Sequence, residues 1–128
     1  MHPHLLEIAD AAKGLLYISE TDQPLEPVEL KTTSIEKEII AMTGANENTE
    51  VEKIGLDHFF RNMIRTYPRS SKEEIASAEK FQRLAELLKK SLHDVTVYRI
   101  GKIQIKAFII GRLDDGSYAG LSTSLVET

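Results

Sequence analysis

The sequence predicts an α+β protein in which helices dominate the first part of the chain and a C-terminal β-meander completes it. Two patterns carry this prediction. Up to about residue 92 the apolar residues recur mainly at helical spacing, and from residue 95 they alternate with polar residues as in strands. The length of 128 residues suits a single domain over residues 1–128, with helices covering at least one face of the sheet.

The N-terminal segment predicts a helix, a loop and an edge strand. Residues 3–16 have the apolar spacing of a helix, which Gly14 weakens near its end. Residues 19–24 are polar and rich in turn formers, so we expect a loop there. Residues 25–31 alternate as a short strand, and Pro27 indicates either a sheet edge or a late start of the strand, because proline has no N–H to donate.

A capping box at Thr33 and Glu36 predicts a second helix, and Gly44 is a suitable residue to end it. In a capping box the first side chain accepts from the backbone of the third helical residue, whose own side chain reaches back. Residues 51–54 then predict a short strand, and residues 56–64 predict a short helix.

A second capping box, at Ser71 and Glu74, opens the longest predicted helix, which runs to about residue 92. Its apolar residues form one stripe, as expected for a helix that packs on a sheet. After it we expect, in order, a strand at 95–100, a two-residue turn at Gly101-Lys102, a strand at 103–111, a turn at Asp115-Gly116 and a strand at 118–126.

Composition excludes several classes of function. The absence of cysteine excludes a disulfide scaffold, a thiol nucleophile and any cysteine-ligated metal. The net charge of −4 disfavours direct binding of nucleic acid and favours a basic partner or a metal. Leader and membrane-spanning segments are not evident, so we expect a cytoplasmic protein without membrane contact and without a cofactor.

Acidic residues supply the candidate chemistry. Glu20 and Asp22 lie in a loop of small polar residues, which is either a solvated turn or a place where a carboxylate is presented to a partner's arginine. The residues alone favour the solvated turn. None of the four histidines falls into a metal-binding or catalytic motif, so we expect no catalytic residue.

The end of the sequence carries a second group of oxygen ligands. Glu127 and Thr128 follow directly on the last predicted strand, and two residues span less than about 7 Å. We therefore expect their carboxylate and hydroxyl groups to stay near one point. Such hard oxygen ligands suit Mg²⁺ and Ca²⁺, although a sheet that ends where the chain ends is the simpler interpretation of these two residues alone.

Spaced sequence blocks resemble the nuclease A inhibitor family over nearly the whole chain. The blocks are Gly-Leu-Leu-Tyr-Ile-Ser-Glu at 14–20, Lys-Phe-Gln-Arg-Leu at 80–84, Val-Tyr-Arg-Ile-Gly at 97–101, Ile-Gly at 110–111, Ala-Gly-Leu-Ser-Thr at 119–123 and Val-Glu-Thr at 126–128. The resemblance implies a three-layer α/β/α sandwich around an antiparallel sheet, similar to plant pathogenesis-related proteins of class 1.

The resemblance also implies a function. Members of the family are not enzymes; they bind a sugar-non-specific, Mg²⁺-dependent DNA/RNA endonuclease one-to-one and block its active site. If the family's contacts apply to this sequence, Thr128 would reach the catalytic metal of the partner nuclease and Glu20 would reach its active-site arginine. Glu127 would assist this binding. Thr128 would thus be a metal ligand only in the complex.

One departure from the family concerns the stretch ahead of the long helix. A family member has a tryptophan at the contact surface there, whereas here Arg69 stands nearest that position and Tyr67 is the aromatic residue close by. We include both as candidate partner-binding residues. This departure leaves open an alternative, namely a module of the same fold that binds a different, non-nuclease partner.

Overall fold

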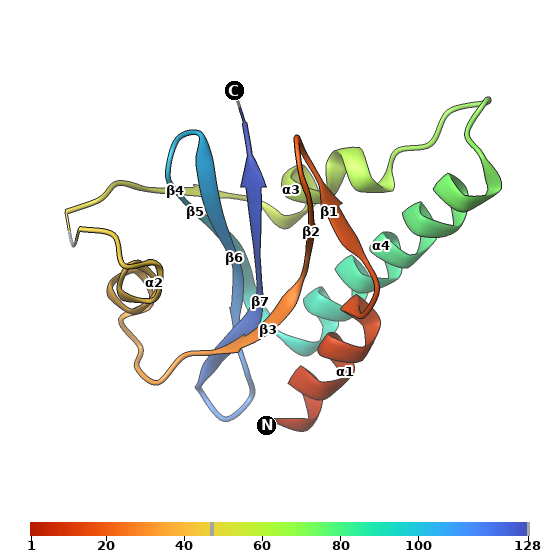
Figure 1. Ribbon diagram of the computed structural model, residues 1–128. Coiled ribbons are helices and arrows are strands. Elements are labelled where there is room, and N and C mark those ends of the chain that lie inside the picture. Colours follow the sequence, from red (N-terminus) through yellow and green to blue (C-terminus); the bar gives the residue numbers. More distant parts are fainter. Residues whose placement is uncertain (47, 128) are drawn as a thin grey trace.

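The computed structural model describes residues 1–46 and 48–127, and within them an antiparallel sheet occupies the centre of the fold. The helices are α1 (Pro3–Ala12), α2 (Ile35–Thr43), α3 (Leu56–Ile64) and α4 (Lys72–Ser91). The strands are β1 (Leu16–Ile18), β2 (Asp22–Pro24), β3 (Glu26–Glu29), β4 (Val51–Ile54), β5 (His93–Ile100), β6 (Gln104–Arg112) and β7 (Tyr118–Val126). Helices α1, α3 and α4 lie over one face of the sheet and α2 over the other (Figure 1).

The sheet confirms the predicted meander. Its strand order is β3-β7-β6-β5-β4, so β5, β6 and β7 are sequential antiparallel neighbours. Among the described residues, strand β3 pairs with β7 alone and carries Pro27 at the sheet edge, which was one of the two predicted alternatives. The mixed α/β architecture is therefore confirmed, while the specific likeness to pathogenesis-related proteins stays a prediction.

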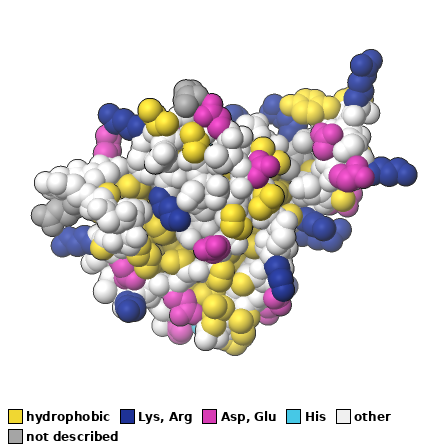
Figure 2. Space-filling model, viewed as in Figure 1, with side chains coloured by type: hydrophobic (Ala, Val, Ile, Leu, Met, Phe, Trp, Pro, Cys, Tyr) yellow, Lys and Arg dark blue, Asp and Glu magenta, His cyan; other side chains and the backbone are white. Residues whose placement is uncertain are grey.

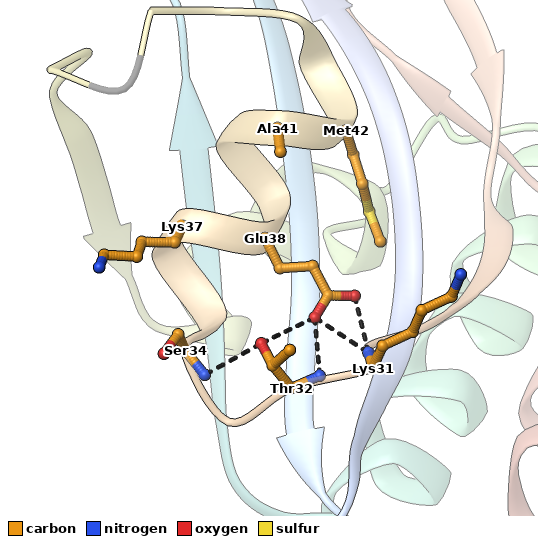
Figure 3. A pocket seen from close by; sticks show the side chains of 7 residues that line it. All are labelled: Lys31, Thr32, Ser34, Lys37, Glu38, Ala41 and Met42. Atoms are coloured by element: carbon orange, nitrogen blue, oxygen red, sulfur yellow. Dashed lines mark hydrogen bonds between the residues drawn. The ribbon is translucent and has the colours of Figure 1, made fainter.

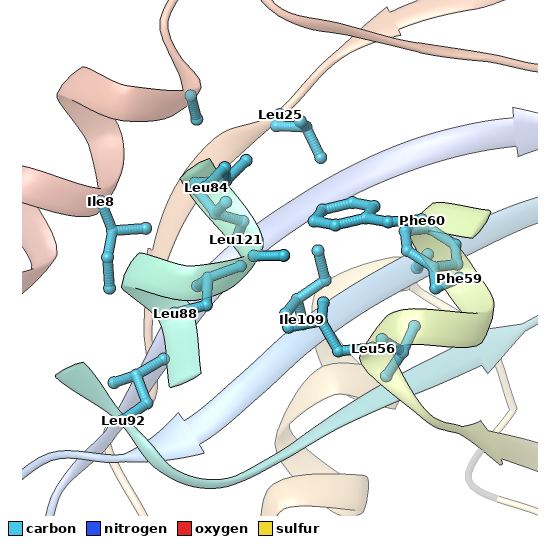
Figure 4. Close-up of a cluster of buried hydrophobic side chains, with 14 of the residues drawn as sticks. Ile8, Leu25, Leu56, Phe59, Phe60, Leu84, Leu88, Leu92, Ile109 and Leu121 are labelled. Carbon is cyan, nitrogen blue, oxygen red and sulfur yellow. The ribbon is translucent and has the colours of Figure 1, made fainter. Parts of the chain in front are cut away.

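Two apolar cores, one on each face, explain the run of four apolar residues at 107–110 of β6. The larger core joins α1, α3 and α4 to the sheet and includes Ile8, Leu25, Leu56, Phe59, Phe60, Leu84, Leu88, Leu92, Ile109 and Leu121 (Figure 4). The smaller core lies under α2 and contains Leu30, Ile39, Ile40, Tyr98, Ile100, Phe108 and Ile110. Alternate residues of β6 therefore enter different cores, and both sets are buried.

The N-terminal prediction is wrong in two places. Helix α1 ends at Ala12 rather than near residue 16, because Gly14 adopts a φ of +82° that turns the chain out of the helix. The chain then forms a β-hairpin, in which Leu16 pairs with Pro24 and Ile18 with Asp22, where we expected helix and loop. Strands of three residues are too short for an alternating pattern to reveal them.

The two predicted capping boxes have different outcomes. The box at Ser71 and Glu74 is confirmed, because each backbone N–H donates to the other residue's side chain, at 3.1 and 3.2 Å. The box at Thr33 is wrong, since Ser34 is the N-cap and makes no side-chain cap bond. Glu36 pairs instead with Lys53 on β4, at 2.7 Å.

The predicted two-residue turn between β5 and β6 is also wrong. Strand β5 ends at Ile100 and β6 begins at Gln104, so residues 101–103 form the connection, and the two strands pair only from Ile100 and Lys106 onward. Within it, Ile103 is 58% exposed rather than part of the strand. The first residues of β6 pair with β7 alone, where Gln104 lies opposite Val126.

The link from β3 to α2 is held by Glu38, which borders an open hollow of about 640 Å³ (Figure 3). Its carboxylate accepts hydrogen bonds from the backbone N–H groups of Lys31 and Thr32, at 2.7 and 2.8 Å, and from the Thr32 hydroxyl at 3.0 Å. Burial raises the pKa of Glu38, but these hydrogen bonds outweigh burial and hold the pKa below its usual value.

We expect Glu38→Gln to destabilise the fold by about 1 kcal/mol at pH 7, a modest loss because water reaches the carboxylate. The pKa of Glu38 is lower in the folded protein than in the unfolded chain, so its contribution is complete above about pH 4.3 and is lost as the pH falls through the folded pKa. Urea unfolding at pH 7, 4 and 3 should show the two proteins converging. A constant difference would contradict this assignment.

Gly120 occupies a position on β7 where only glycine fits. A Cβ atom there would lie 1.7 Å from the carbonyl oxygen of Ile109 on the adjacent strand. Because that obstacle is backbone, we expect Gly120→Ala to cost about 3 kcal/mol of unfolding free energy. Gly55→Ala is the matched control, since a Cβ at Gly55 meets nothing within 4 Å, and it should cost under about 1 kcal/mol in thermal unfolding. Equal losses would contradict the steric explanation.

Candidate functional site

The tip of the β1–β2 hairpin lies against the end of β7, at the end of the sheet opposite the N-terminus (Figure 1). The Val126 N–H donates to Ser19 Oγ at 3.1 Å, and the Glu20 N–H donates to the Val126 carbonyl at 3.4 Å. The N–H and the carbonyl of Val126 thus both hold the tip of the hairpin. The structure thereby brings Glu20 next to the segment that carries Glu127.

The hairpin is also fastened to α3. The Tyr17 ring stacks on Phe59 with centroids 4.4 Å apart, and its hydroxyl donates to the Phe59 carbonyl at 2.9 Å. The Ile18 N–H lies 3.5 Å from the Met63 sulfur. With β7 on one side and α3 on the other, the hairpin presents Glu20 from a fixed support.

Glu127 is held at two points. Its N–H donates to the Ile103 carbonyl at 2.9 Å, and its carboxylate accepts from Arg99 Nη2 at 2.6 Å. The Arg99 side chain is only 17% exposed, and its second carboxylate partner is Glu52 at 3.5 Å. The final described residue of the chain therefore has a defined backbone and side-chain position.

The pKa of the Tyr17 hydroxyl depends on the charged groups at this end of the sheet. Burial raises the pKa of its hydroxyl, the Arg99 guanidinium opposes that effect, and the Glu127 carboxylate adds to it. The pKa of Tyr17 is raised overall, so the hydroxyl stays neutral and remains a hydrogen-bond donor at physiological pH. Tyr17, Arg99 and Glu127 thus lie within electrostatic reach of one another.

The end of the sheet that carries Glu20 and Glu127 also exposes apolar side chains. Ile18 on the hairpin and Ile103 beside Glu127 are 56% and 58% exposed. On the face drawn in Figure 2, the basic side chains of the described residues are scattered rather than gathered into one patch. Apolar area beside carboxylates suits contact with a basic protein surface better than contact with phosphates.

The other predicted site residues lie at different distances from this end of the sheet. Asp22 is exposed on β2, in the same hairpin as Glu20. Tyr67, which is 63% exposed, and Arg69 lie in the α3–α4 connection, which runs away from β1 to the free end of α4 (Figure 1). Thr128, the principal predicted residue, lies outside the described residues.

Arg99 on β5 binds Glu127 at this end of the sheet, and the sequence prediction did not include it among the site residues. Strand alternation places it on the same face of β5 as the buried Val97, where a charge is unexpected. A charged residue at a strand position where alternation predicts a core side chain was the signal that could have identified Arg99. Its Nε atom is buried and has no hydrogen-bond partner among the described residues.

Neither a metal site nor a membrane-spanning helix is found in the described part of the chain. Residues 1–46 and 48–127 contain no group of three or more histidine or acidic side chains arranged to hold a metal ion. None of the helices in this part combines the length and apolar character that crossing a membrane requires.

Carboxylates held beside exposed apolar side chains are compatible with a surface that binds a basic protein partner. The sequence model of the family described as nuclease A inhibitor-like protein matches residues 3–128, and the chain belongs to this family. A search of curated proteins finds no match. Membership of the family points to a nuclease inhibitor, which acts by binding and has a protein partner.

Proposed function

We propose that this protein inhibits a sugar-non-specific, Mg²⁺-dependent DNA/RNA endonuclease by binding it one-to-one and occupying its active site with Thr128 and Glu20. Family membership supports the class of partner. The observation that carries the mechanism is the pair of hydrogen bonds that joins the Glu20 hairpin tip to Val126. These bonds hold the Glu20 tip against the end of β7, and Glu127 follows directly from that end.

The chemistry of the two groups fits such an active site. A nuclease of this class stabilises phosphate with a metal and with cationic side chains, so two oxygen groups at fixed positions can replace the phosphate. Glu20 would pair with the arginine, and Thr128 would offer oxygen to Mg²⁺. Thr128 follows Glu127 in the sequence, and Glu127 is held at two points.

The net charge of the protein and its exposed apolar side chains also favour binding. The net charge of −4 attracts a cationic cleft and raises the association rate at low salt. Ile18 and Ile103 supply apolar contact beside the two acidic segments. A complex of standard size buries about 1,600 Å² in total, so further residues of this end of the sheet must contribute. We place the action in the cytoplasm of the cell that makes the nuclease.

Titration of the protein into a non-specific Mg²⁺-dependent endonuclease that digests plasmid DNA tests this function. We expect a sharp loss of nuclease activity at one equivalent. The protein without Thr128 should keep the fold, as judged by its melting temperature, but lose most of the inhibition. Absence of inhibition at large excess, across several nucleases of this class, would overturn the proposal.

The α3–α4 connection favours a second candidate, a module of the same fold with a non-nuclease partner. Tyr67 and Arg69 are both exposed where a family member has a tryptophan at the contact surface. A changed anchor residue can change specificity, because aromatic anchors dominate binding energy. A pull-down from the source cell that recovers a non-nuclease protein and no nuclease would favour this candidate.

A further inference from the structure

Arg99 is an unexpected residue on the side of β5 that faces the larger core, where Val97 also lies. Its register neighbours are Glu52 on β4 and Ala107 on β6, and the adjacent inward residue, Val97, is fully buried. Burying a guanidinium is costly unless its hydrogen bonds are satisfied, and the Nε atom of Arg99 lacks a partner among the described residues. An apolar residue would avoid that cost, so stability alone does not account for this arginine.

The carboxylates bound to Arg99 connect three strands. Glu52 is its cross-strand neighbour at 3.5 Å, whereas Glu127 follows β7 and lies 28 residues further along the chain. The 2.6 Å contact with Glu127 is a short, charge-assisted hydrogen bond, which is the stronger type. Arg99 therefore ties the segment after β7 to β5, across the intervening strand β6.

We propose that Arg99 is a positioning residue for inhibition: it holds Glu127, and so fixes the direction in which the chain leaves β7 toward Thr128. This inference rests on the proposed function. Glu127 then acts as a tether within this protein and not as a contact to the nuclease, because its carboxylate is engaged by Arg99. A terminal segment ordered before binding loses less conformational entropy when it enters the active site.

A double-mutant cycle on Arg99→Met and Glu127→Gln tests this role. Methionine keeps the apolar stem and removes the charge, and Glu127 is exposed enough for its variant to fold. We expect each single variant to raise the inhibition constant about tenfold, and the double variant to be no worse than either one. Arg99→Lys should restore part of the loss. Additive losses would mean that Glu127 contacts the nuclease directly and would overturn the proposal.

Glu52→Gln is the matched control, since it removes the other carboxylate partner of Arg99 and leaves Glu127 in place. Its inhibition constant should stay within about twofold of the original. The ¹⁵N relaxation of the free protein gives a readout that needs no nuclease. Arg99→Met should increase the picosecond-to-nanosecond mobility of the Glu127 amide, and Glu52→Gln should not. Unchanged mobility in Arg99→Met would refute the tether even if the proposed function failed.

Discussion

Two glycines added after Thr128 should raise the inhibition constant about 100-fold or more, while the melting temperature stays unchanged. The extension forces extra backbone into the space that the proposal assigns to the nuclease metal. A hundredfold loss corresponds to about 2.7 kcal/mol, within the range of one lost metal contact or an equivalent clash. Activity titration at fixed nuclease and Mg²⁺ concentrations measures it.

The matched control for this extension is two glycines placed before Met1. The N-terminus lies at the opposite end of the sheet from the end of β7 (Figure 1), so the control changes length and mass without approaching the site. It should inhibit as the original protein does. If the C-terminal extension inhibits equally well, Thr128 does not reach the metal, and Glu20 with its apolar surroundings must account for any inhibition.

The regular parts of the fold were predictable because periodicity there is long enough to detect. Strands β6 and β7 span nine residues each, and α4 spans 20 residues with one apolar stripe and a complete capping box. The β1–β2 hairpin was not predictable in this way, because its strands have three residues each and Ile18 is exposed. Gly14 marked the end of α1, yet its left-handed φ becomes evident only in the structure.

The resemblance to the family names the candidate site residues one by one, but the sequence does not predict how they are brought together. The family resemblance named Glu20 and Glu127 as candidates, and it gave no reason for the first to lie beside the segment that carries the second. Their proximity depends on Ser19, which is 107 residues from Val126 in sequence and 3.1 Å from it in space. No local pattern encodes such a contact, because it requires both the missed hairpin and the correct register of β7.

Glu20→Lys should raise the inhibition constant about 1,000-fold, the larger of the two effects on binding. Removing one member of a desolvated ion pair costs about 2–5 kcal/mol, and reversing its sign adds repulsion between the introduced ammonium group and the nuclease arginine. Most of the loss should appear in the dissociation rate, which surface plasmon resonance resolves. The backbone bond from residue 20 to the Val126 carbonyl does not involve the replaced side chain, so the hairpin should keep its place.

Glu7→Lys separates this local effect from the change in net charge. Glu7 is exposed on α1, which begins at the N-terminal end of the molecule, and its substitution alters the net charge by the same amount. It should slow association modestly at low salt and leave the dissociation rate unchanged, because distant charges act through steering alone. If both variants weaken inhibition equally, overall charge governs binding, and the specific contact proposed between Glu20 and the nuclease arginine is refuted.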